Sequence, residues 1–236
     1  MRRSMLLCVA GAVSVSAFQI SIIFSVRQAG VCAGTLMSIG TGSVCTGAVS
    51  VLRDRTLPPG WLASAILSAC GCSLLASSTH SRIETFGVLA SFIAGLAYAA
   101  YTIAAKTLVS RGEDGTTVMS AFFTWSTILL SPTLSGTQWH EILSIRGAIA
   151  IGWLGIAATA GAYFLFSRGL PRVSAPHATL VGLAEPVTAS LLALIILQER
   201  MNMWSILGIS AMLISFCLAA FSNFGFSGKF KRFIDR

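Results

Sequence analysis

Residues 147–167 read GAIAIGWLGIAATAGAYFLFS, a run that contains no Asp, Glu, Lys or Arg. A bilayer core about 30 Å thick is crossed by a helix of roughly 20 apolar residues, so a run of this length predicts a membrane span. Comparable runs cover residues 5–26, 29–52, 61–78, 86–109, 118–134, 174–197 and 204–224. The sequence therefore predicts an all-α membrane protein with about eight transmembrane helices.

The composition agrees with this class and excludes a soluble globular domain. Of the 236 residues, 55% are hydrophobic and only 10% are charged, and the mean hydropathy is +0.80. A soluble domain of this size needs many more charged residues to cover its surface. The connections between the apolar runs are short, so no room is left for a soluble catalytic domain.

The first apolar run also resembles a secretory signal peptide. It follows Arg2-Arg3, and Val15-Ser16-Ala17 has the small residues of a cleavage site. The apolar run continues past this site through Phe24, however, which is typical of a span that is not cleaved. We therefore expect the first run to remain as a membrane helix.

The net charge of +8 comes from basic residues in the connections and not from a nucleic-acid patch. If the N-terminus is cytoplasmic, the cytoplasmic segments carry most of these residues, namely Arg2, Arg3, Arg53, Arg55, Lys106, Arg111, Arg168, Arg172, Lys229, Lys231, Arg232 and Arg236. The opposite side then carries only Arg27, Arg82, Arg146 and Arg200. This bias follows the positive-inside rule. We predict a multi-pass protein of the cell membrane with both termini in the cytoplasm and no nucleic-acid partner.

The sequence offers no cluster of residues for catalysis or for metal binding. The six cysteines lie inside apolar runs without zinc-ligand spacing to histidine, so we interpret them as small packing residues. No Ser/His/Asp arrangement, phosphate-binding glycine loop or paired intramembrane carboxylate is found in the sequence. We predict neither an enzyme nor a cofactor.

Two segments of the chain, 28–76 and 172–220, resemble one another. Each has a Thr-Leu pair, then an apolar run, then a charged turn, and then a tryptophan that begins the next run. The corresponding residues are Thr35 and Thr179, Arg53-Asp54-Arg55 and Glu199-Arg200, and Trp61 and Trp204. The first charged turn is predicted to be cytoplasmic and the second external, so the two copies cross the membrane in opposite senses. Inverted repeats of this kind are the architecture of secondary transporters, whose site lies near the bilayer midplane.

The second copy carries motifs that resemble a known family. It contains Leu183-Ala184-Glu185-Pro186-Val187, then Leu197-Gln198-Glu199-Arg200, then Gly208 in the last run. This order is similar to the closing signature of EamA-type transporters of the drug/metabolite transporter superfamily. Residues 95–101, GLAYAAY, resemble the helix that begins the second repeat of that family. The resemblance covers nearly the whole chain and implies two inverted repeats of five helices each.

The chain departs from this pattern in its first repeat. Residues 86–224 supply the five helices of a second repeat, followed by a basic cytoplasmic tail at 225–236, whereas residues 1–78 supply three. Alignment from the C-terminus leaves the first two helices missing. In the family these helices help to line the substrate cavity. The departure therefore predicts a truncated transporter, a misassigned start codon, or a cavity that a homodimer or another partner completes by supplying the missing helices.

Glu185 is the most informative candidate residue. It lies near the middle of the run 174–197, where an ionised carboxylate costs about 2.5–3.5 kcal/mol on insertion scales. We therefore expect Glu185 to face protein or a water-filled cavity. Pro186 removes a backbone donor, as is common where a helix lines a cavity. An interhelical hydrogen bond that holds the repeats together is the structural alternative.

Other polar and aromatic residues in the apolar runs are further candidates for a substrate cavity. Aromatic side chains with polar tips suit amphipathic or aromatic solutes, but they equally suit helix packing. His177 lies eight residues before Glu185, about 12 Å along a helix, so it is a candidate proton relay that cannot touch Glu185. The remaining candidates are Gln19, Tyr98, Tyr101, Trp125 and Tyr163.

Together these features predict a transporter of small molecules in the lipid bilayer. The resemblance implies an exporter or permease for metabolites, amino acids or drugs that works by alternating access, with proton coupling through Glu185 as one expectation. The alternative is a truncated, non-transporting family member that acts as a membrane scaffold or an obligate subunit.

Overall fold

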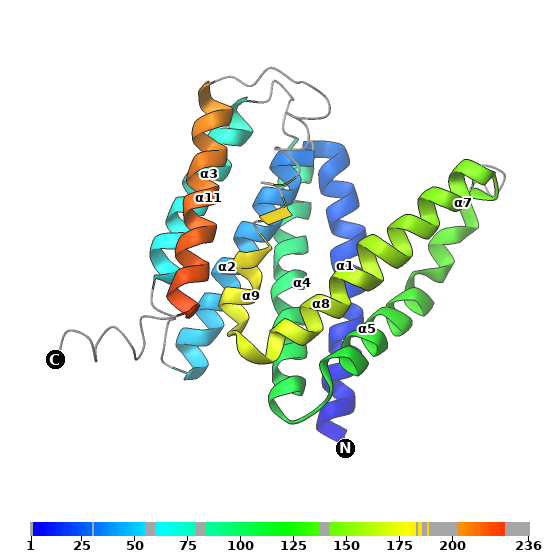
Figure 1. Cartoon of the computed structure of the whole chain (residues 1–236). Coiled ribbons are helices and arrows are strands. Elements are labelled where there is room, and N and C mark those ends of the chain that lie inside the picture. Colours follow the sequence, from blue (N-terminus) through cyan, green and yellow to red (C-terminus); the bar gives the residue numbers. More distant parts are fainter. Residues whose placement is uncertain are drawn as a thin grey trace.

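The computed structural model describes residues 2–29, 31–54, 60–78, 84–136, 142–182, 184–185, 188 and 203–224. Over these ranges the chain forms helices joined by short connections and contains no strand (Figure 1). The elements are α1 (Arg2–Ala29), α2 (Val31–Asp54), α3 (Trp61–Ser78), α4 (Thr85–Ser110), α5 (Gly115–Leu130), η1 (Ser131–Gly136), α7 (Ile145–Gly152), η2 (Trp153–Gly161), α8 (Ala162–Gly169), η3 (Leu170–Arg172), α9 (Ala175–Val181) and α11 (Met203–Phe224).

The described helices confirm the prediction of an all-α membrane protein. Five helical stretches within the described ranges are long and apolar enough to cross a membrane, namely Ser4–Ala29, Gly34–Leu52, Thr85–Ser110, Gly115–Gly136 and Ile145–Arg172. Shorter apolar segments, Trp61–Gly71 and Ile206–Ser215, lie within α3 and α11. The run 174–197 is described only in part, and Glu199-Arg200 and the tail 225–236 lie outside the described residues.

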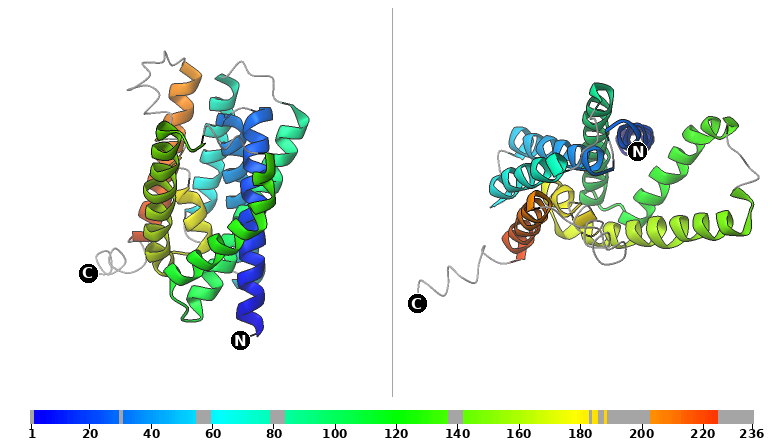
Figure 2. Two further views of the ribbon diagram at one scale, coloured as in Figure 1. Left: turned by 90° about the vertical axis from the view of Figure 1, so that its right-hand side faces the viewer. Right: turned by 90° about the horizontal axis from the view of Figure 1, so that it is seen from above.

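The helices form a bundle from which one helical hairpin leans away. Helix α4 packs against α1 and α2, α2 also contacts α9, and α3 pairs with α11 (Figure 1). The hairpin consists of α5 and the continuous helical arm α7–η2–α8, and its outer end diverges from the bundle when seen from above (Figure 2). Helix α1 holds the base of the hairpin through its contact with α5.

The polarity of the bundle is that of a membrane protein. Large apolar side chains point outward along the hairpin, with Ile149 68%, Trp153 70% and Ile156 76% exposed. A soluble protein would not leave such a surface in water, whereas lipid solvates it well. Most of the buried polar residues are serines and threonines, and small hydroxyl residues of this kind let membrane helices approach one another closely.

Pairs of hydroxyl groups connect helices that are distant in the sequence. Their oxygen–oxygen distances are 3.0 Å for Ser16–Ser126, 2.6 Å for Ser25–Ser91, 2.9 Å for Thr46–Thr179 and 2.5 Å for Ser68–Ser215. Hydrogen bonds between membrane helices contribute about 0.6 kcal/mol each on average. Their value here is mainly positional, because each pair fixes the register between two helices.

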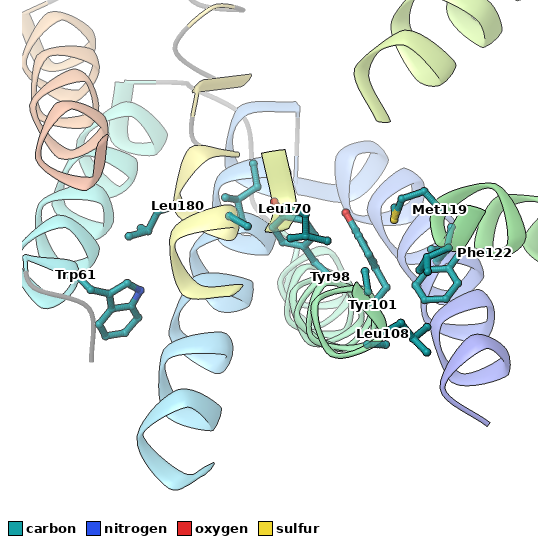
Figure 3. Packing of buried hydrophobic residues seen from close by; sticks show 14 of the residues in the cluster. Trp61, Tyr98, Tyr101, Leu108, Met119, Phe122, Leu170 and Leu180 are labelled. Carbon is teal, nitrogen blue, oxygen red and sulfur yellow. The ribbon is translucent and has the colours of Figure 1, made fainter. Parts of the chain in front are cut away.

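The apolar core extends through the bundle, and one part of it lies where the hairpin base meets α4. Figure 3 shows Tyr98, Tyr101 and Leu108 on α4 beside Phe122 of α5 and Leu170 of η3. All five belong to one cluster of buried side chains. This packing fixes α4 as the central helix, and it is this helix that carries two of the predicted site tyrosines.

The arm α7–η2–α8 is not a regular α-helix, although residues 147–167 predict one uninterrupted span. Trp153–Gly161 is π-helical, and none of its residues is buried. A Cβ atom on Gly152 or Gly155 would meet no other atom within 4 Å. π-helical segments are rare and occur frequently at functional sites. The hydropathy of the run carries no signal for this π-helical segment.

Asp114 caps the start of α5, outside the membrane spans, and this cap leads to a pH-dependent prediction. The backbone N–H of Thr117 donates to its carboxylate at 2.8 Å, which holds the pKa of Asp114 below its ordinary value. A lowered pKa means that the stabilisation is present above the unfolded-state pKa and is lost as the pH falls through the folded-state pKa. Asp114→Ala should therefore lower the midpoint of thermal unfolding in detergent at pH 7, and the difference from the parent chain should shrink in acid.

Asp114→Ser is the matched control for this change, because serine caps helices without titrating in this range. It should retain most of the parent stability and keep it at low pH. An equal loss in both variants at every pH would contradict the assigned cap.

Candidate functional site

A cavity of about 640 Å³ lies within the bundle on the side that faces the hairpin. It is bounded by α1, α2, α4, η2, α8 and the segment that follows α9. Its lining residues are Phe18, Gln19, Ile22, Ile39, Tyr98, Tyr101, Ala158, Ala162, Tyr163, Phe166, Gly182, Glu185 and Thr188. The lining is mostly apolar and aromatic with a few polar groups, which is the usual composition of a small-molecule site.

Aromatic rings form one continuous wall of this cavity. The ring centroids of Tyr98 and Tyr101 are 5.3 Å apart, and Phe18 lies 5.8 Å from the first and 6.1 Å from the second. The hydroxyl oxygens of Tyr101 and Tyr163 are 3.4 Å apart, so either hydroxyl can donate to the other. This contact joins α4 to α8 across the cavity. The wall therefore combines ring faces with phenolic donors and acceptors.

Two glycines create the space that Tyr98 occupies. A Cβ atom on Gly42 of α2 would lie 2.6 Å from Cδ1 of the Tyr98 ring, and a Cβ atom on Gly182 would lie 2.6 Å from its hydroxyl oxygen. Neither distance is tolerated by a real side chain, so both positions require glycine for the tyrosine to fit. As a result, Tyr98 is fixed between α2 and the end of α9 and is only 8% exposed.

Glu185 supplies the carboxylate of the cavity. Its backbone N–H donates to the carbonyl oxygen of Gly182 at 3.1 Å, and its side chain is solvent-accessible. Within the described part of the chain, the structure records no hydrogen bond and no ion pair to this carboxylate. The hydroxyl of Thr188 donates to the backbone carbonyls of Ala184 and Glu185, both at 2.8 Å, and not to the carboxylate. An interhelical hydrogen bond from Glu185 therefore has no partner among the described residues.

The structure brings five of the predicted site residues into one cavity: Gln19, Tyr98, Tyr101, Tyr163 and Glu185. They come from three helices and from the segment after α9, and the interval between Gln19 and Glu185 spans most of the chain. The sequence singled them out as polar or aromatic residues in apolar runs, but it could not show that they meet.

Two predicted candidates do not line this cavity, and a third is not among the described residues. Trp125 lies on α5 and is 56% exposed, so its ring faces outward. His177 is buried near the start of α9, where its Nδ1 lies 2.9 Å from the Ser174 hydroxyl oxygen. Pro186 lies outside the described residues.

Phe18, Phe166 and Thr188 line the cavity and were not predicted from the sequence. One of them had a signal that could have been used, because Thr188 lies three residues beyond Glu185 and shares its helix face. Phe18 and Phe166 had no such signal, because nothing in the sequence separates them from the other phenylalanines of the apolar runs.

Comparison with known proteins places the chain in a family. The EamA-like transporter family matches residues 85–221, which is more than half of the chain. A protein of Bacillus subtilis (strain 168), described as the uncharacterized transporter YwfM, is 35% identical over 206 residues, covering 86% of this chain and 69% of that protein. The matched family region contains α4, α5, α8 and Glu185, and hence most of the cavity wall. The chain belongs to the EamA-like transporter family and is a multi-pass membrane transporter.

Proposed function

We propose that this protein moves small organic solutes across the cell membrane by alternating access, with Glu185 as the carboxylate that binds the solute or the coupling proton. The observation that carries the proposal is the Glu185 side chain, which lines a cavity of about 640 Å³ without a protein partner in the described residues. An unpaired carboxylate at membrane depth is costly. Binding of a cation or a proton to the Glu185 carboxylate removes that cost, so binding of either one is favoured.

A single carboxylate can couple two fluxes because its two ligands compete. When a solute cation occupies Glu185 the proton is displaced, and the reverse holds when the proton returns. If the cavity opens to one side at a time, each cycle exchanges one ligand for the other. A proton gradient then drives the solute in the opposite direction, which is export when protons flow inward.

Contacts between α3 and α11 support the two-repeat arrangement that alternating access requires. These helices follow the charged turn in the two copies and begin at or next to the corresponding tryptophans. The Ser215 hydroxyl donates to the Ser64 carbonyl at 2.7 Å, and a Cβ on Gly71 would lie 2.8 Å from the Gly208 carbonyl oxygen. Corresponding helices of the two copies thus pack directly on each other, as is expected next to a twofold axis in the membrane plane.

The aromatic wall favours solutes that combine an apolar or aromatic body with a cationic group. Ring faces attract a cation within about 6 Å of their centroids, and the effect grows when the site excludes water. Tyr98, Tyr101 and Tyr163 also offer hydroxyls that can bind an amine or a carboxylate. Amino acids, metabolites and drugs of this kind are the substrate classes that we propose.

The basic residues at one end of the bundle support a cytoplasmic location for both termini. The start of α1, the α4–α5 turn and η3 lie at the same end of the molecule (Figure 1). Arg111 and Arg172 lie at this end, and positive residues are retained on the cytoplasmic side. We propose the same orientation for the protein in the cell membrane.

The test is flux in proteoliposomes that contain the purified chain. A pH gradient that drives protons into the liposomes is imposed. Efflux or uptake is then followed for a panel of labelled amino acids and fluorescent aromatic cations. Gradient-dependent flux above that of protein-free liposomes is the expected result. Well-folded protein that moves no member of the panel, in either orientation and with the gradient reversed, would count against transport by this chain alone.

The second candidate function is a subunit of a larger membrane assembly. It is favoured by the arm Ile145–Arg172, whose most apolar stretch is 0% buried within the chain. A homodimer or a partner that supplies further helices would cover this arm. Mass measurement of the purified protein in lipid nanodiscs by native mass spectrometry separates the two, since a single copy with full flux excludes the subunit function.

A further inference from the structure

A second cavity, of about 390 Å³, lies between α2, α4 and the start of α9. It shares no lining residue with the cavity of about 640 Å³ that contains Glu185. Arg111 caps the C-terminal end of α4 and Ser174 precedes α9, so this cavity lies at the end of the bundle that carries the N-terminus. In the proposed orientation it faces the cytoplasmic leaflet.

The lining of this cavity is basic and rich in hydroxyl groups. Lys106 and Arg111 supply two positive charges, and the serine and threonine residues of the wall include Ser110 of α4. No acidic residue is found among the described residues that line it. Two cations that share one partly enclosed space repel each other unless an anion is bound between them.

Lys106 is already fixed in position, although it keeps donor capacity. Its ammonium group donates to the carbonyl oxygens of Leu170 at 2.9 Å and of Pro171 at 3.1 Å. An ammonium group has three N–H donors, so one remains for a ligand. The two carbonyls hold the side chain over the cavity in a defined geometry.

Arg111 has its whole guanidinium group available. Across the described ranges, the structure records no hydrogen bond and no ion pair from its side chain. A guanidinium group presents donors in a planar fork that fits two oxygens of a phosphate group. An arginine fork beside a fixed lysine is a donor set that suits a tetrahedral anion.

We propose that this cavity binds a phosphate group, carried either by an anionic lipid headgroup or by a soluble phosphate ester. Val49, Ile103 and Pro176 form the apolar part of the wall, where the glycerol or another organic portion would lie. The cavity is large enough for a headgroup, and its position at the end of α4 is where headgroups meet membrane helices. The site is independent of the transport proposal, because binding can be measured without flux.

The test uses the whole chain in nanodiscs of uncharged phosphatidylcholine. Binding of dihexanoyl phosphatidylglycerol, of glycerol phosphate and of inorganic phosphate is measured by isothermal titration calorimetry at fixed salt. Arg111→Gln should weaken binding at least about tenfold, the loss typical of one charge-assisted hydrogen-bonding partner. Binding of the lipid analogue only assigns the site to headgroups, whereas binding of glycerol phosphate or phosphate as well assigns it to soluble esters.

Arg168→Gln is the matched control. Arg168 is also basic and lies at the end of α8 toward the same side, but its guanidinium carbon stands 4.6 Å from the centroid of the Phe164 ring and outside this cavity. The Arg168→Gln variant should bind phosphate within about twofold of the parent chain, since the charge that it removes does not line the cavity. Lys106→Gln is a second variant that should also lose affinity. Equal losses in Arg111→Gln and Arg168→Gln, or no binding by the parent chain, would overturn the proposal.

Discussion

Glu185→Gln is expected to reduce gradient-driven flux to the level of protein-free liposomes while leaving the protein folded. Glutamine keeps the size and hydrogen-bonding capacity of the side chain but can neither carry a negative charge nor exchange a proton. The structure gives the carboxylate no hydrogen-bond partner in the described residues, so its removal breaks no recorded contact. The expected thermal stability is therefore unchanged or higher, because a group that is costly to bury in charged form has been replaced by a neutral one.

Glu84→Gln is the matched control for this experiment. Glu84 is exposed just before α4 and makes no capping hydrogen bond, so its loss removes the same charge outside the cavity. Parent-like flux in Glu84→Gln together with background flux in Glu185→Gln would assign the effect to the cavity. Full flux in Glu185→Gln would show that the carboxylate has no part in transport, and loss of folded protein would give Glu185 a structural role instead.

The spans were predictable from sequence because a bilayer imposes one length on every helix. Runs such as 5–26 and 86–109 coincide with α1 and α4 to within a few residues. The first and last residues of each helix are harder to predict, because capping residues and not hydropathy determine them. α5 begins at Gly115, before the predicted run 118–134, because Asp114 satisfies the N–H of Thr117.

The sequence predicts which residues lie within a membrane span. It does not predict as well which of them face the bundle and which face outward. Val118 and Trp125 are two helical turns apart on nearly the same face of α5, yet Val118 is 4% exposed and Trp125 is 56% exposed. The helix leans away from the bundle over this distance (Figure 2), so one face is covered at its base and open further along. That tilt results from tertiary packing, and no local pattern in the run encodes it.

The tyrosines of α4 were predictable for the opposite reason. Tyr98 and Tyr101 lie three residues apart and therefore share a face of any α-helix. Their hydroxyls are costly to expose to lipid, so that face must be turned inward. What the sequence could not supply is the partner of that face, because the contact with Tyr163 depends on how α8 crosses the bundle.

Gly11→Val is expected to destabilise the protein by about 1–3 kcal/mol, the usual cost of overpacking a tight interface. A Cβ atom on Gly11 of α1 would lie 2.2 Å from Cζ of Phe122 on α5. The ring of Phe122 is fully buried and has no space to retreat, so the two helices must separate. Separation also strains the nearby Ser16–Ser126 hydrogen bond of 3.0 Å. Since Phe123 of α5 packs on Tyr163 with centroids 4.4 Å apart, the shift reaches the cavity, and flux should fall along with stability.

Gly40→Val separates this packing effect from the intrinsic effect of exchanging glycine for valine in a helix. Gly40 lies within α2, where a Cβ atom would meet nothing within 4 Å, so the two variants share the same change in helix propensity without the same clash. The midpoint of thermal unfolding in one detergent is the measurement. A large fall for Gly11→Val with no fall for Gly40→Val would show that α5, and with it the hairpin that carries Tyr163, is held to the bundle by the close approach of Gly11 and Phe122. Equal falls would mean that α1 and α5 are not in close contact at this point.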